Sequence, residues 1–441
     1  MGRGVFQTHM ERTLIANLGP RVGEKVLIAG WMHNFRRLSK FGFLLLRDAS
    51  GIAQIVVEKD QLDSLAAIQD ESVLQVEGLV VAEKNAASGY EIHQPVITII
   101  SPVTEAVPFP INKAVFNVNL DTFLDNATFG LRHPDRKATF ALSAALMAAF
   151  RSHLNENGFT EVTTPKIVAS ATESGANVFA LDYFHRKAFL AQSPQFYKQI
   201  MVGVFERVFE VAPVFRAEPH STARHLNEYV SLDVEFGFIR DHHDVMEVLG
   251  GLIRAMLKYL QTHNQRELEQ LKVRMPLAPD KFPSIYFPDA QKVILERYGE
   301  DCSHEPDLSP QHERWLGEWA LQEYQSDYLF VTGYPMAKRP FYTHPNPADP
   351  RYANGFDLLF RGIELVTGGQ RLHRYEDYVQ ALQQRGLPLE PFEGYLETFR
   401  FGMPPHGGFA IGLERFLMQL LGVSNLRETT LFPRDMDRLT P

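Results

Sequence analysis

The sequence predicts an α+β protein, in which a small five-stranded β-barrel precedes a larger domain of antiparallel strands flanked by helices. Two observations support this prediction. Five β-rich runs, separated by polar or glycine-containing turns, fill residues 25–102. After residue 133, apolar residues at helical spacing alternate with strand-like runs joined by turns. We therefore expect a barrel in residues 1–105, a linker in residues 106–132 and a second domain in residues 133–441.

The composition is that of an ordinary globular chain. Its 441 residues are 45% hydrophobic and 22% charged, and the length suits two or three domains. The single cysteine, Cys302, excludes an internal disulfide and a cysteine-rich zinc site. Because the N-terminus lacks an apolar signal segment, and no apolar run approaches the roughly 20 residues that span a bilayer, we expect a cytoplasmic protein. The net charge of -9 argues against indiscriminate nucleic-acid binding but permits a local basic patch.

The five N-terminal runs suit an OB-type barrel, whose exposed face commonly binds single-stranded nucleic acid. A window without acidic residues places cations beside aromatic rings, namely Arg36, Arg37, Lys40 and Arg47 beside Phe35, Phe41 and Phe43. Cations for phosphates and rings for base stacking are what such a face needs. The alternative is a barrel that keeps these rings in its core.

A helix and a polar segment open the second domain. Apolar residues of 140–154 keep helical spacing, and a strand-like run follows Gly158. Beyond it, Glu173 lies in a glycine-containing loop that could close over a small ligand. Ser193, Gln195 and Lys198 could line a polar pocket. Both segments could equally be ordinary loops.

The central feature of the chain is the stretch of residues 216–238. Residues 208–215 and 230–238 are β-prone and flank a turn-rich segment, which predicts an antiparallel pair with a long loop. The second run alternates strictly, so Ser231, Asp233 and Glu235 share one face. The side chains that could clamp a polyphosphate at the loop are Arg216, Glu218, Arg224 and His225. A solvated sheet face is the alternative.

A second strand pair carries two carboxylates. A two-residue turn at Arg361 and Gly362 would place Glu364 opposite Leu359, on the same face as Asp357. Two nearby carboxylates suit Mg²⁺ beside phosphates. The alternative is a surface hairpin with scattered acids.

Near the C-terminus, GGFAIGLERFLMQLLG changes from a glycine-rich strand into a helix. The glycines let a ligand approach the backbone, and Arg415 in the first helical turn could contact an anion. The chain contains neither GxxxxGK[ST] nor GxGxxG, which excludes a P-loop and a Rossmann fingerprint.

Taken in order, these segments resemble the class II aminoacyl-tRNA synthetases. GFTEVTTP with its preceding helix is similar to the first motif of that family, FRAEPHSTARHLNEYVSLDVEF to the second and GGFAIGLERF to the third. The barrel resembles the N-terminal anticodon-binding OB domain of the subgroup that charges aspartate, asparagine or lysine. Within that subgroup, AQSPQFYKQ and ELVTGGQRLHRYEDY resemble aspartyl-tRNA synthetases, and the compact spacing resembles the archaeal type. The resemblance implies a class II synthetase catalytic domain in residues 133–441.

The resemblance implies roles for the residues above. The implied catalytic residues are Arg216, Glu364 and Arg415, and the implied ligands of Mg²⁺ are Asp357, Glu364 and Thr367. The residues implied for ATP are Arg216, Glu218, Arg224, His225, Leu226, Glu364, Gly412, Leu413, Glu414 and Arg415. Those implied for aspartate are Glu173, Ser193, Gln195, Lys198, Arg216, Asp233, Thr367 and Arg371.

These roles agree with the chemistry of adenylate formation. Attack of a carboxylate on the α-phosphate of ATP brings two anions together, so cations must neutralise and position both, and no general base is needed. Lys198 and Arg371 would recognise the side-chain carboxylate of aspartate, whereas an amide would leave them poorly paired. The implied product, aspartyl-adenylate, would pass its aspartyl group to the 3′ end of tRNA-Asp.

The resemblance also implies anticodon contacts in the barrel. Phe43 would stack on a base, while Gln54 and Glu91 would read its edge. His33 and Asn85 lie where members of the subgroup differ in how strictly they read the last anticodon base. His33 resembles relaxed enzymes that also charge tRNA-Asn, whereas Asn85 matches neither common pattern.

Some positions depart from the family pattern, and other functions stay open. Phe123 and Ala127 stand where similar enzymes usually have arginine, and Thr367 stands where serine is common. An asparaginyl-tRNA synthetase is disfavoured by Lys198, and an adenylate-forming asparagine synthetase by the barrel. A non-catalytic tRNA-binding paralogue is disfavoured because the three implied catalytic residues are all present. Since the first motif forms the dimer interface of similar proteins, we expect a homodimer.

Overall fold

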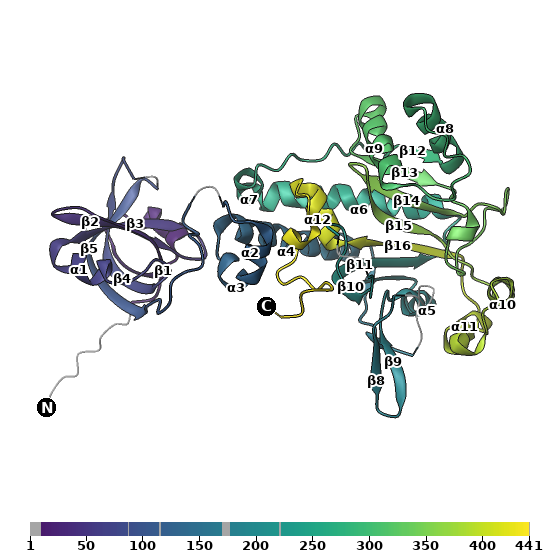
Figure 1. The fold of residues 1–441 in the computed structure, drawn as a ribbon, viewed down its shortest axis with the longest axis horizontal. Coiled ribbons are helices and arrows are strands. Elements are labelled where there is room, and N and C mark those ends of the chain that lie inside the picture. Colours follow the sequence, from purple (N-terminus) through teal and green to yellow (C-terminus); the bar gives the residue numbers. More distant parts are fainter. Residues whose placement is uncertain (1–9, 87, 114–115, 170–176, 220–221, 441) are drawn as a thin grey trace. The chain divides into compact units, whose positions relative to one another are not determined.

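The computed structural model describes residues 10–86, 88–113, 116–169, 177–219 and 222–440 (Figure 1). These fall into two compact units, Met1–Val118 and Asn119–Pro441. The helices of residues 119–132, α2 (Leu120–Asp125) and α3 (Ala127–Gly130), are part of the second unit. The functional limits expected from the sequence, 1–105, 106–132 and 133–441, remain predictions. Within the described ranges, we find no helix that is both long and apolar enough to span a membrane.

The first unit contains a closed five-stranded barrel, as predicted. Its strands are β1 (Lys25–Arg37), β2 (Phe41–Arg47), β3 (Ile52–Glu58), β4 (Val73–Ala82) and β5 (Tyr90–Ser101), in the order β1-β2-β3-β5-β4, with α1 (Leu62–Ala66) between β3 and β4. Aliphatic side chains at alternate positions, such as Val26 and Ile28, fill the interior. Phe43 lies at a partly exposed position of β2, so this ring is available outside the core.

The second unit is built on an eight-stranded sheet. Its strand order is β12 (Ser284–Tyr286), β13 (Tyr328–Thr332), β14 (Gly355–Phe360), β15 (Ile363–Gln370), β16 (His406–Gly412), β11 (Glu228–Gly237), β10 (Arg207–Phe215) and β6 (Thr160–Glu161). Among the described strands of this sheet, only the outermost pairs, β12 with β13 and β6 with β10, are parallel. A small second sheet contains β7 (Ile167–Val168), β9 (Arg186–Leu190) and β8 (Ala180–Tyr183).

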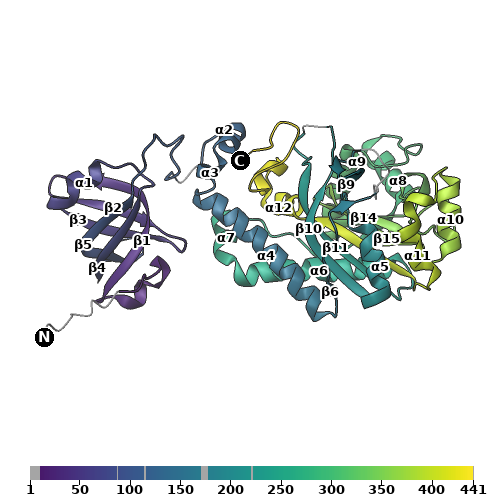
Figure 2. The ribbon, with the colours of Figure 1, turned by 90° about the horizontal axis from the view of Figure 1, so that it is seen from below.

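One face of the large sheet is covered by helices. The helices α4 (Pro134–Glu156), α6 (His242–His263) and α12 (Leu413–Leu421) contribute buried side chains to one core with β11, β14 and β16. Figure 2 shows α4 and α6 side by side along this face. The remaining helices are α5 (Gln195–Phe205), α7 (Gln265–Gln270), α8 (Phe287–Tyr298), α9 (Pro310–Tyr324), α10 (Tyr375–Gln384) and α11 (Glu393–Arg400). The α+β fold class is therefore confirmed.

Strand β11 has the two faces that its alternation predicts. Leu232, Val234 and Phe236 enter the helix-covered core. On the opposite face, Asp233 and Glu235 are also buried, with exposed fractions of 1% and 0%. The alternative of a solvated sheet face is therefore wrong. Burying charged groups is costly unless they are paired, so these two carboxylates need partners. Phe238, the last residue of the alternating run 230–238 and in step with Phe236, lies past the strand end instead, with a φ of 60°, and is 70% exposed.

A buried histidine at the start of α6 makes the stability of the fold depend on pH. Burial, and then the charge of neighbouring His243, lower the pKa of His242 from 6.5 to about 4. The unfolded chain therefore binds the proton more readily, and the free energy of unfolding should fall as the pH decreases from 6.5 towards 4. Over this pH window, we expect the free energy of unfolding of His242→Phe to fall by roughly 2 to 3 kcal/mol less than that of the wild type. Urea denaturation at pH 7.5 and 4.5 measures this difference in the free energy of unfolding. His304→Asn is the control, because His304 is exposed. An equal loss of stability in wild type and His242→Phe would contradict the expectation.

Candidate active site

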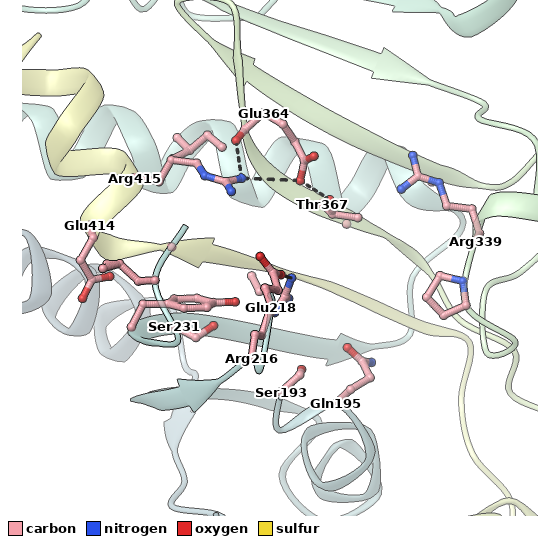
Figure 3. A pocket seen from close by; sticks show the side chains of 18 of the residues that line it. Ser193, Gln195, Arg216, Glu218, Ser231, Arg339, Glu364, Thr367, Glu414 and Arg415 are labelled. Atoms are coloured by element: carbon pink, nitrogen blue, oxygen red, sulfur yellow. Dashed lines mark hydrogen bonds and ion pairs between the residues drawn. The ribbon is translucent and has the colours of Figure 1, made fainter. Parts of the chain in front are cut away.

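The face of the large sheet opposite the helices holds a pocket of about 360 Å³ (Figure 3). It brings together most of the residues expected from the sequence: Ser193, Gln195, Lys198, Arg216, Glu218, Arg224, His225, Leu226, Glu364, Thr367, Arg371, Gly412, Glu414 and Arg415. Asp233, Asp357 and Leu413 are not among the lining residues. Glu173 lies outside the described residues. One pocket thus contains residues from each polar segment that the sequence singled out, apart from the loop of Glu173.

Arginine and carboxylate side chains line the end of the pocket near the loop between β10 and β11. These strands pair antiparallel, as predicted. The Arg216 guanidinium lies 5.7 Å from the ring centre of Tyr229, and its Nη1 is 4.0 Å from Glu218 Oε1. His225 Nε2 lies 3.4 Å from Glu218 Oε2. Cations and one acceptor side by side suit a nucleotide, whose phosphates need positive charge and whose base carries an amino group.

The helix that begins at Leu413 supports this end of the pocket. Arg415 donates to the Glu364 carbonyl oxygen at 2.8 Å, so the guanidinium is fixed beside the Glu364 carboxylate. Glu414 accepts from the Val230 backbone N–H with both carboxylate oxygens, at 3.0 and 3.1 Å, and thereby joins α12 to β11. Leu413 is buried in the core. Of these side chains, Arg415 is the one placed to meet an anion.

The strand pair β14–β15 holds the carboxylates expected to bind Mg²⁺. Leu359 pairs with Glu364, as predicted, and Arg361 and Gly362 adopt the positive φ values of 49° and 71° that a two-residue hairpin turn requires. Thr367 Oγ1 donates to Glu364 Oε1 at 2.9 Å. The sequence did not predict that Asp357 would form a bidentate pair with Arg339, at 3.1 and 2.9 Å.

The electrostatics of this region fit a bound cation. Burial and then Glu364 raise the pKa of Glu313 on α9 to about 7, and burial raises the pKa of Asp357 although Arg339 opposes the shift. Three carboxylates near one another repel when all are ionised, and a bound divalent cation would offset this repulsion. Glu364 and Thr367 present oxygen atoms to the pocket, and oxygen ligands are those that Mg²⁺ prefers, so these two residues fit the metal. Both Asp357 oxygens are held by Arg339.

At the opposite end of the pocket, two cations and two carboxylates form a buried quartet. Lys198 Nζ lies 3.0 Å from Asp233 Oδ1 and 3.2 Å from Glu235 Oε2, and Arg371 Nε donates to Glu235 Oε1 at 2.9 Å. Burial alone would raise the pKa of Glu235, but Arg371 and Lys198 hold it below its ordinary value. Both cations therefore already contact internal carboxylates, which the sequence did not predict, and their role toward the side chain of aspartate stays a prediction.

Three polar residues in or behind the pocket were given no role from the sequence. Glu235 shares the polar face of Asp233, but alternation cannot tell a buried polar face from a solvated one. Arg339 lies in a region, residues 272–340, whose sequence carries no clear pattern. Ser231 donates to Asp233 Oδ2 at 2.5 Å. The alternation of the strand already placed Ser231 on the same face as Asp233, so the sequence could have indicated this contact.

The barrel places the predicted anticodon residues in different environments. Gln54 Nε2 donates to Glu91 Oε1 at 2.5 Å, so these two residues meet as a pair. Asn85 is exposed. His33 is 8% exposed and contacts Arg47, which pairs with Glu71 at 2.8 Å. Arg47 was expected to be a cation for phosphates, and this is wrong because the guanidinium is buried in an ion pair.

Two of the positions that depart from the family pattern, Phe123 and Ala127, are buried in the second unit. Phe123 is 2% exposed, and the Arg136 guanidinium lies 4.6 Å from its ring centre. Ala127 is also buried. An arginine at either position would have to place its charge in a packed interior.

Comparison with known proteins agrees with this architecture. The family described as tRNA synthetases class II (D, K and N) matches residues 119–436, and the OB-fold nucleic acid binding domain matches residues 26–100. An aspartate–tRNA(Asp/Asn) ligase of Thermus thermophilus is 45% identical over 430 residues, which cover 98% of this chain and 100% of that protein. An aspartate–tRNA(Asp) ligase of Thermococcus kodakarensis is 39% identical over 444 residues, covering 99% and 100%. A crystal structure of asparaginyl-tRNA synthetase from Pyrococcus horikoshii with asparaginyl-adenylate has a TM-score of 0.90 at 31% identity, covering 98% of this chain and 100% of that one.

The fold and the matches over nearly the whole chain define a class II aminoacyl-tRNA synthetase with an anticodon-binding OB domain. The chain belongs to the D, K and N group of that class. The family resemblance read from the three sequence motifs is therefore confirmed.

Proposed function

We propose that this enzyme is an aspartate–tRNA ligase, which activates L-aspartate with ATP and transfers it to the 3′ end of tRNA-Asp. The observation that carries the proposal is the pair of buried cations, Lys198 and Arg371, at one end of the pocket. A side-chain carboxylate can pair with both cations, whereas an amide brings no charge to them. The aspartate–tRNA ligases among its relatives support the same substrate.

The proposed reaction uses the two ends of the pocket together. Arg216 would hold the α-phosphate of ATP while one oxygen of the aspartate α-carboxylate attacks the phosphorus, so that an O–P bond forms and pyrophosphate leaves. Arg224, His225 and Arg415 would stabilise the charge on the departing phosphates. Glu218 would accept from the adenine amino group. A ribose hydroxyl of the tRNA terminus then attacks the acyl carbon, and AMP leaves.

Glu364, Thr367 and Asp357 would hold Mg²⁺ in this proposal. When bound, the metal neutralises phosphate charge and helps to hold the phosphates in line. Leu226 packs with Met418 and Leu426 behind this end of the pocket, and the Gly412 backbone would lie against the adenine. Arg415 keeps its position through the Glu364 carbonyl oxygen.

An asparaginyl-tRNA synthetase is the second candidate, because one observation favours it. The quartet of Lys198, Arg371, Asp233 and Glu235 contains two positive and two negative groups, so its charge is balanced before any substrate enters. A neutral amide would leave this balance unchanged. The similarity to the asparaginyl-tRNA synthetase structure agrees with this alternative at the level of the fold.

Charging separate tRNA-Asp and tRNA-Asn transcripts with labelled aspartate or labelled asparagine decides among these functions. Aspartate on tRNA-Asp supports the proposal. Aspartate on both transcripts would establish the relaxed tRNA specificity that we infer from His33. Asparagine transfer without aspartate transfer would overturn the proposed substrate.

The barrel is proposed to read the anticodon through Phe43, Gln54 and Glu91. We expect Phe43→Ala to raise the KM for tRNA by roughly 5- to 150-fold, because one base–aromatic stack contributes about 1 to 3 kcal/mol. ATP–pyrophosphate exchange, which needs no tRNA, should stay within about twofold of wild type. Ile100→Ala is the matched control, since Ile100 is an exposed apolar residue of the same barrel. An unchanged KM for tRNA would remove Phe43 from the interface.

We further propose a cytoplasmic homodimer. The cytoplasm is where aminoacyl-tRNAs serve translation, and the dimer rests on the first-motif resemblance. The apolar stripe of α4 gives the dimer no separate support, because it packs into the core of its own unit. Light scattering across a concentration series measures the association, and a mass of 50.2 kDa at all concentrations would contradict it.

A further inference from the structure

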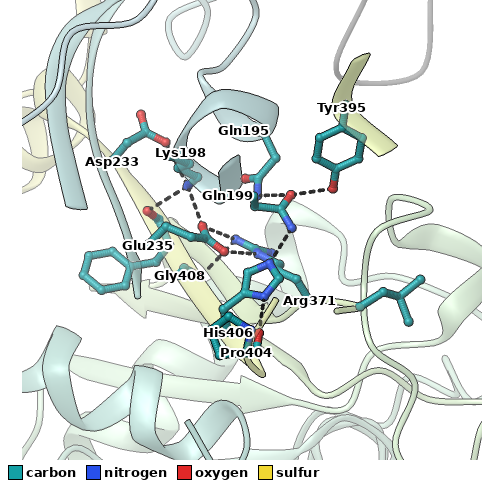
Figure 4. Close-up of polar contacts among 12 residues, drawn as sticks. Gln195, Lys198, Gln199, Asp233, Glu235, Arg371, Tyr395, Pro404, His406 and Gly408 are labelled. Atoms are coloured by element: carbon teal, nitrogen blue, oxygen red, sulfur yellow. Dashed lines mark hydrogen bonds and ion pairs between the residues drawn. The ribbon is translucent and has the colours of Figure 1, made fainter. Parts of the chain in front are cut away.

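A buried polar network lies behind the amino-acid end of the pocket (Figure 4). It contains Gln199 of α5, Tyr378 of α10, Tyr395 of α11 and His406 of β16, which are at most 5% exposed. Gln199 is the centre of the network and also contacts Gln195, which lines the pocket. These contacts determine which way each amide and ring is turned.

The backbone at Pro404 sets the protonation of His406. His406 Nδ1 lies 2.9 Å from the Pro404 carbonyl oxygen, which can only accept, so Nδ1 carries the proton. Burial lowers the pKa of His406 to about 4, so the ring is neutral at physiological pH. Nε2 is therefore an acceptor and needs a donor.

His406 in turn orients the Gln199 carboxamide. Gln199 Nε2 lies 2.8 Å from His406 Nε2 and 3.0 Å from the Tyr378 hydroxyl, so its two N–H groups have acceptors. The Tyr378 hydroxyl uses its own proton on the Leu372 carbonyl oxygen, at 2.8 Å. The opposite amide orientation would place the Gln199 oxygen against the lone pair of His406 Nε2 and lose that bond, and it could accept from Tyr378 only if this hydroxyl released the Leu372 carbonyl oxygen.

Gln199 then orients Gln195. Gln199 Oε1 accepts from Gln195 Nε2 at 3.0 Å. The Tyr395 hydroxyl lies 2.9 Å from both Gln199 Oε1 and the Tyr378 hydroxyl, and it can donate its one proton to either. Because the Gln195 amide nitrogen is held from behind, its Oε1 lies on the other side of the carboxamide as an acceptor for a ligand. A reversed Gln195 would present N–H groups and repel an ammonium.

We infer that Gln199 is a positioning residue for amino-acid recognition, which keeps the oxygen of Gln195 directed at the substrate ammonium. This inference rests on the proposed function only in that the substrate is an amino acid. It applies equally to aspartate and asparagine, since both carry the same ammonium.

The test compares ligands with and without that ammonium. Gln199→Met removes the acceptor for Gln195, and we expect the KM for aspartate in ATP–pyrophosphate exchange to rise roughly tenfold, as for loss of a hydrogen bond to a charged group. Succinate is aspartate without its amino group, so its inhibition constant should stay within about twofold, as should the KM for ATP. In a double-mutant cycle, Gln195→Met with Gln199→Met should be no worse than Gln195→Met alone.

Gln291→Met is the matched control, because Gln291 is a buried glutamine that donates to the carbonyl oxygens of Cys302 and Glu305 instead. It should leave the ratio of the aspartate and succinate constants unchanged. The inference is overturned if Gln199→Met weakens the binding of succinate and of aspartate equally. It is also overturned if the effects of Gln195→Met and Gln199→Met on the KM for aspartate are fully additive. Should Gln199→Met fail to fold, Gln199→Asn shortens the reach to Gln195 by one methylene, and an unchanged ratio would overturn the inference as well.

The experiment separates this inference from the proposed function. If wild type activates asparagine rather than aspartate, the proposed function fails. The same cycle is then run with asparagine and succinamate, which lacks the amino group of asparagine, and it still decides the role of Gln199.

Discussion

Lys198→Leu is expected to lower kcat/KM for aspartate activation by roughly a thousandfold or more, with a much smaller change in the KM for ATP. The substitution removes the cation proposed for the substrate carboxylate and leaves Asp233 and Glu235 with one shared partner fewer. Removing one partner of a buried ion pair costs about 3 to 5 kcal/mol, and here the unpaired carboxylates also repel the substrate. ATP–pyrophosphate exchange with varied aspartate and varied ATP separates the two constants.

Lys166→Met is the matched control for general damage. Lys166 Nζ pairs with the buried Glu210 at 2.8 Å, so its loss also leaves a carboxylate with one partner fewer, and the residue does not line the pocket. Both variants should unfold at lower urea concentrations than wild type. If Lys166→Met loses aspartate activation as severely as Lys198→Leu, the effect comes from stability rather than recognition. An unchanged KM for aspartate in Lys198→Leu would remove the basis for the proposed substrate.

Local patterns in the sequence predict the parts of the site that depend on neighbouring residues. The turn at Arg361 and Gly362 follows from hairpin geometry, and the register that places Glu364 opposite Leu359 follows from the turn. The positive φ of Arg361 is tolerated because its guanidinium donates to the Gln419 and Arg274 carbonyl oxygens, at 2.8 and 2.7 Å. Those two acceptors are distant from Arg361 in the sequence, so no local pattern predicts them.

Pairings between distant segments could not be predicted in the same way. Arg371 meets Glu235 because β16 pairs with both β11 and β15, and Arg371 directly follows β15. The sequence indicated a carboxylate-binding arginine but not that an internal carboxylate already occupies it. In the barrel, Arg47 looked like a surface cation because its window contains no acid, yet its partner Glu71 lies beyond the next strand. Charge read along the chain therefore gave candidate residues but not their partners.

Glu364→Gln is expected to lower kcat of adenylate formation by roughly 100- to 1,000-fold and to raise the Mg²⁺ concentration needed for half-maximal rate. The amide keeps the size of the side chain and an oxygen that can accept from Thr367, but it removes the charge that would hold the metal. Arg415 should stay in place, because it is held by the Glu364 carbonyl oxygen rather than the carboxylate. The KM for aspartate should change little, since the quartet around Lys198 is untouched.

Glu313→Gln is the matched control for this prediction, because Glu313 is the carboxylate beside Glu364 and accepts from its backbone N–H at 3.3 Å. An amide retains that acceptor, and with a pKa raised to about 7 the side chain is partly protonated at neutral pH in any case. We expect its kcat to stay within about fivefold of wild type. Exchange rates measured across a Mg²⁺ titration compare the variants. Equal losses in both would show that the charge of the whole cluster matters, and a Glu364→Gln enzyme with wild-type Mg²⁺ dependence would exclude Glu364 as the metal ligand.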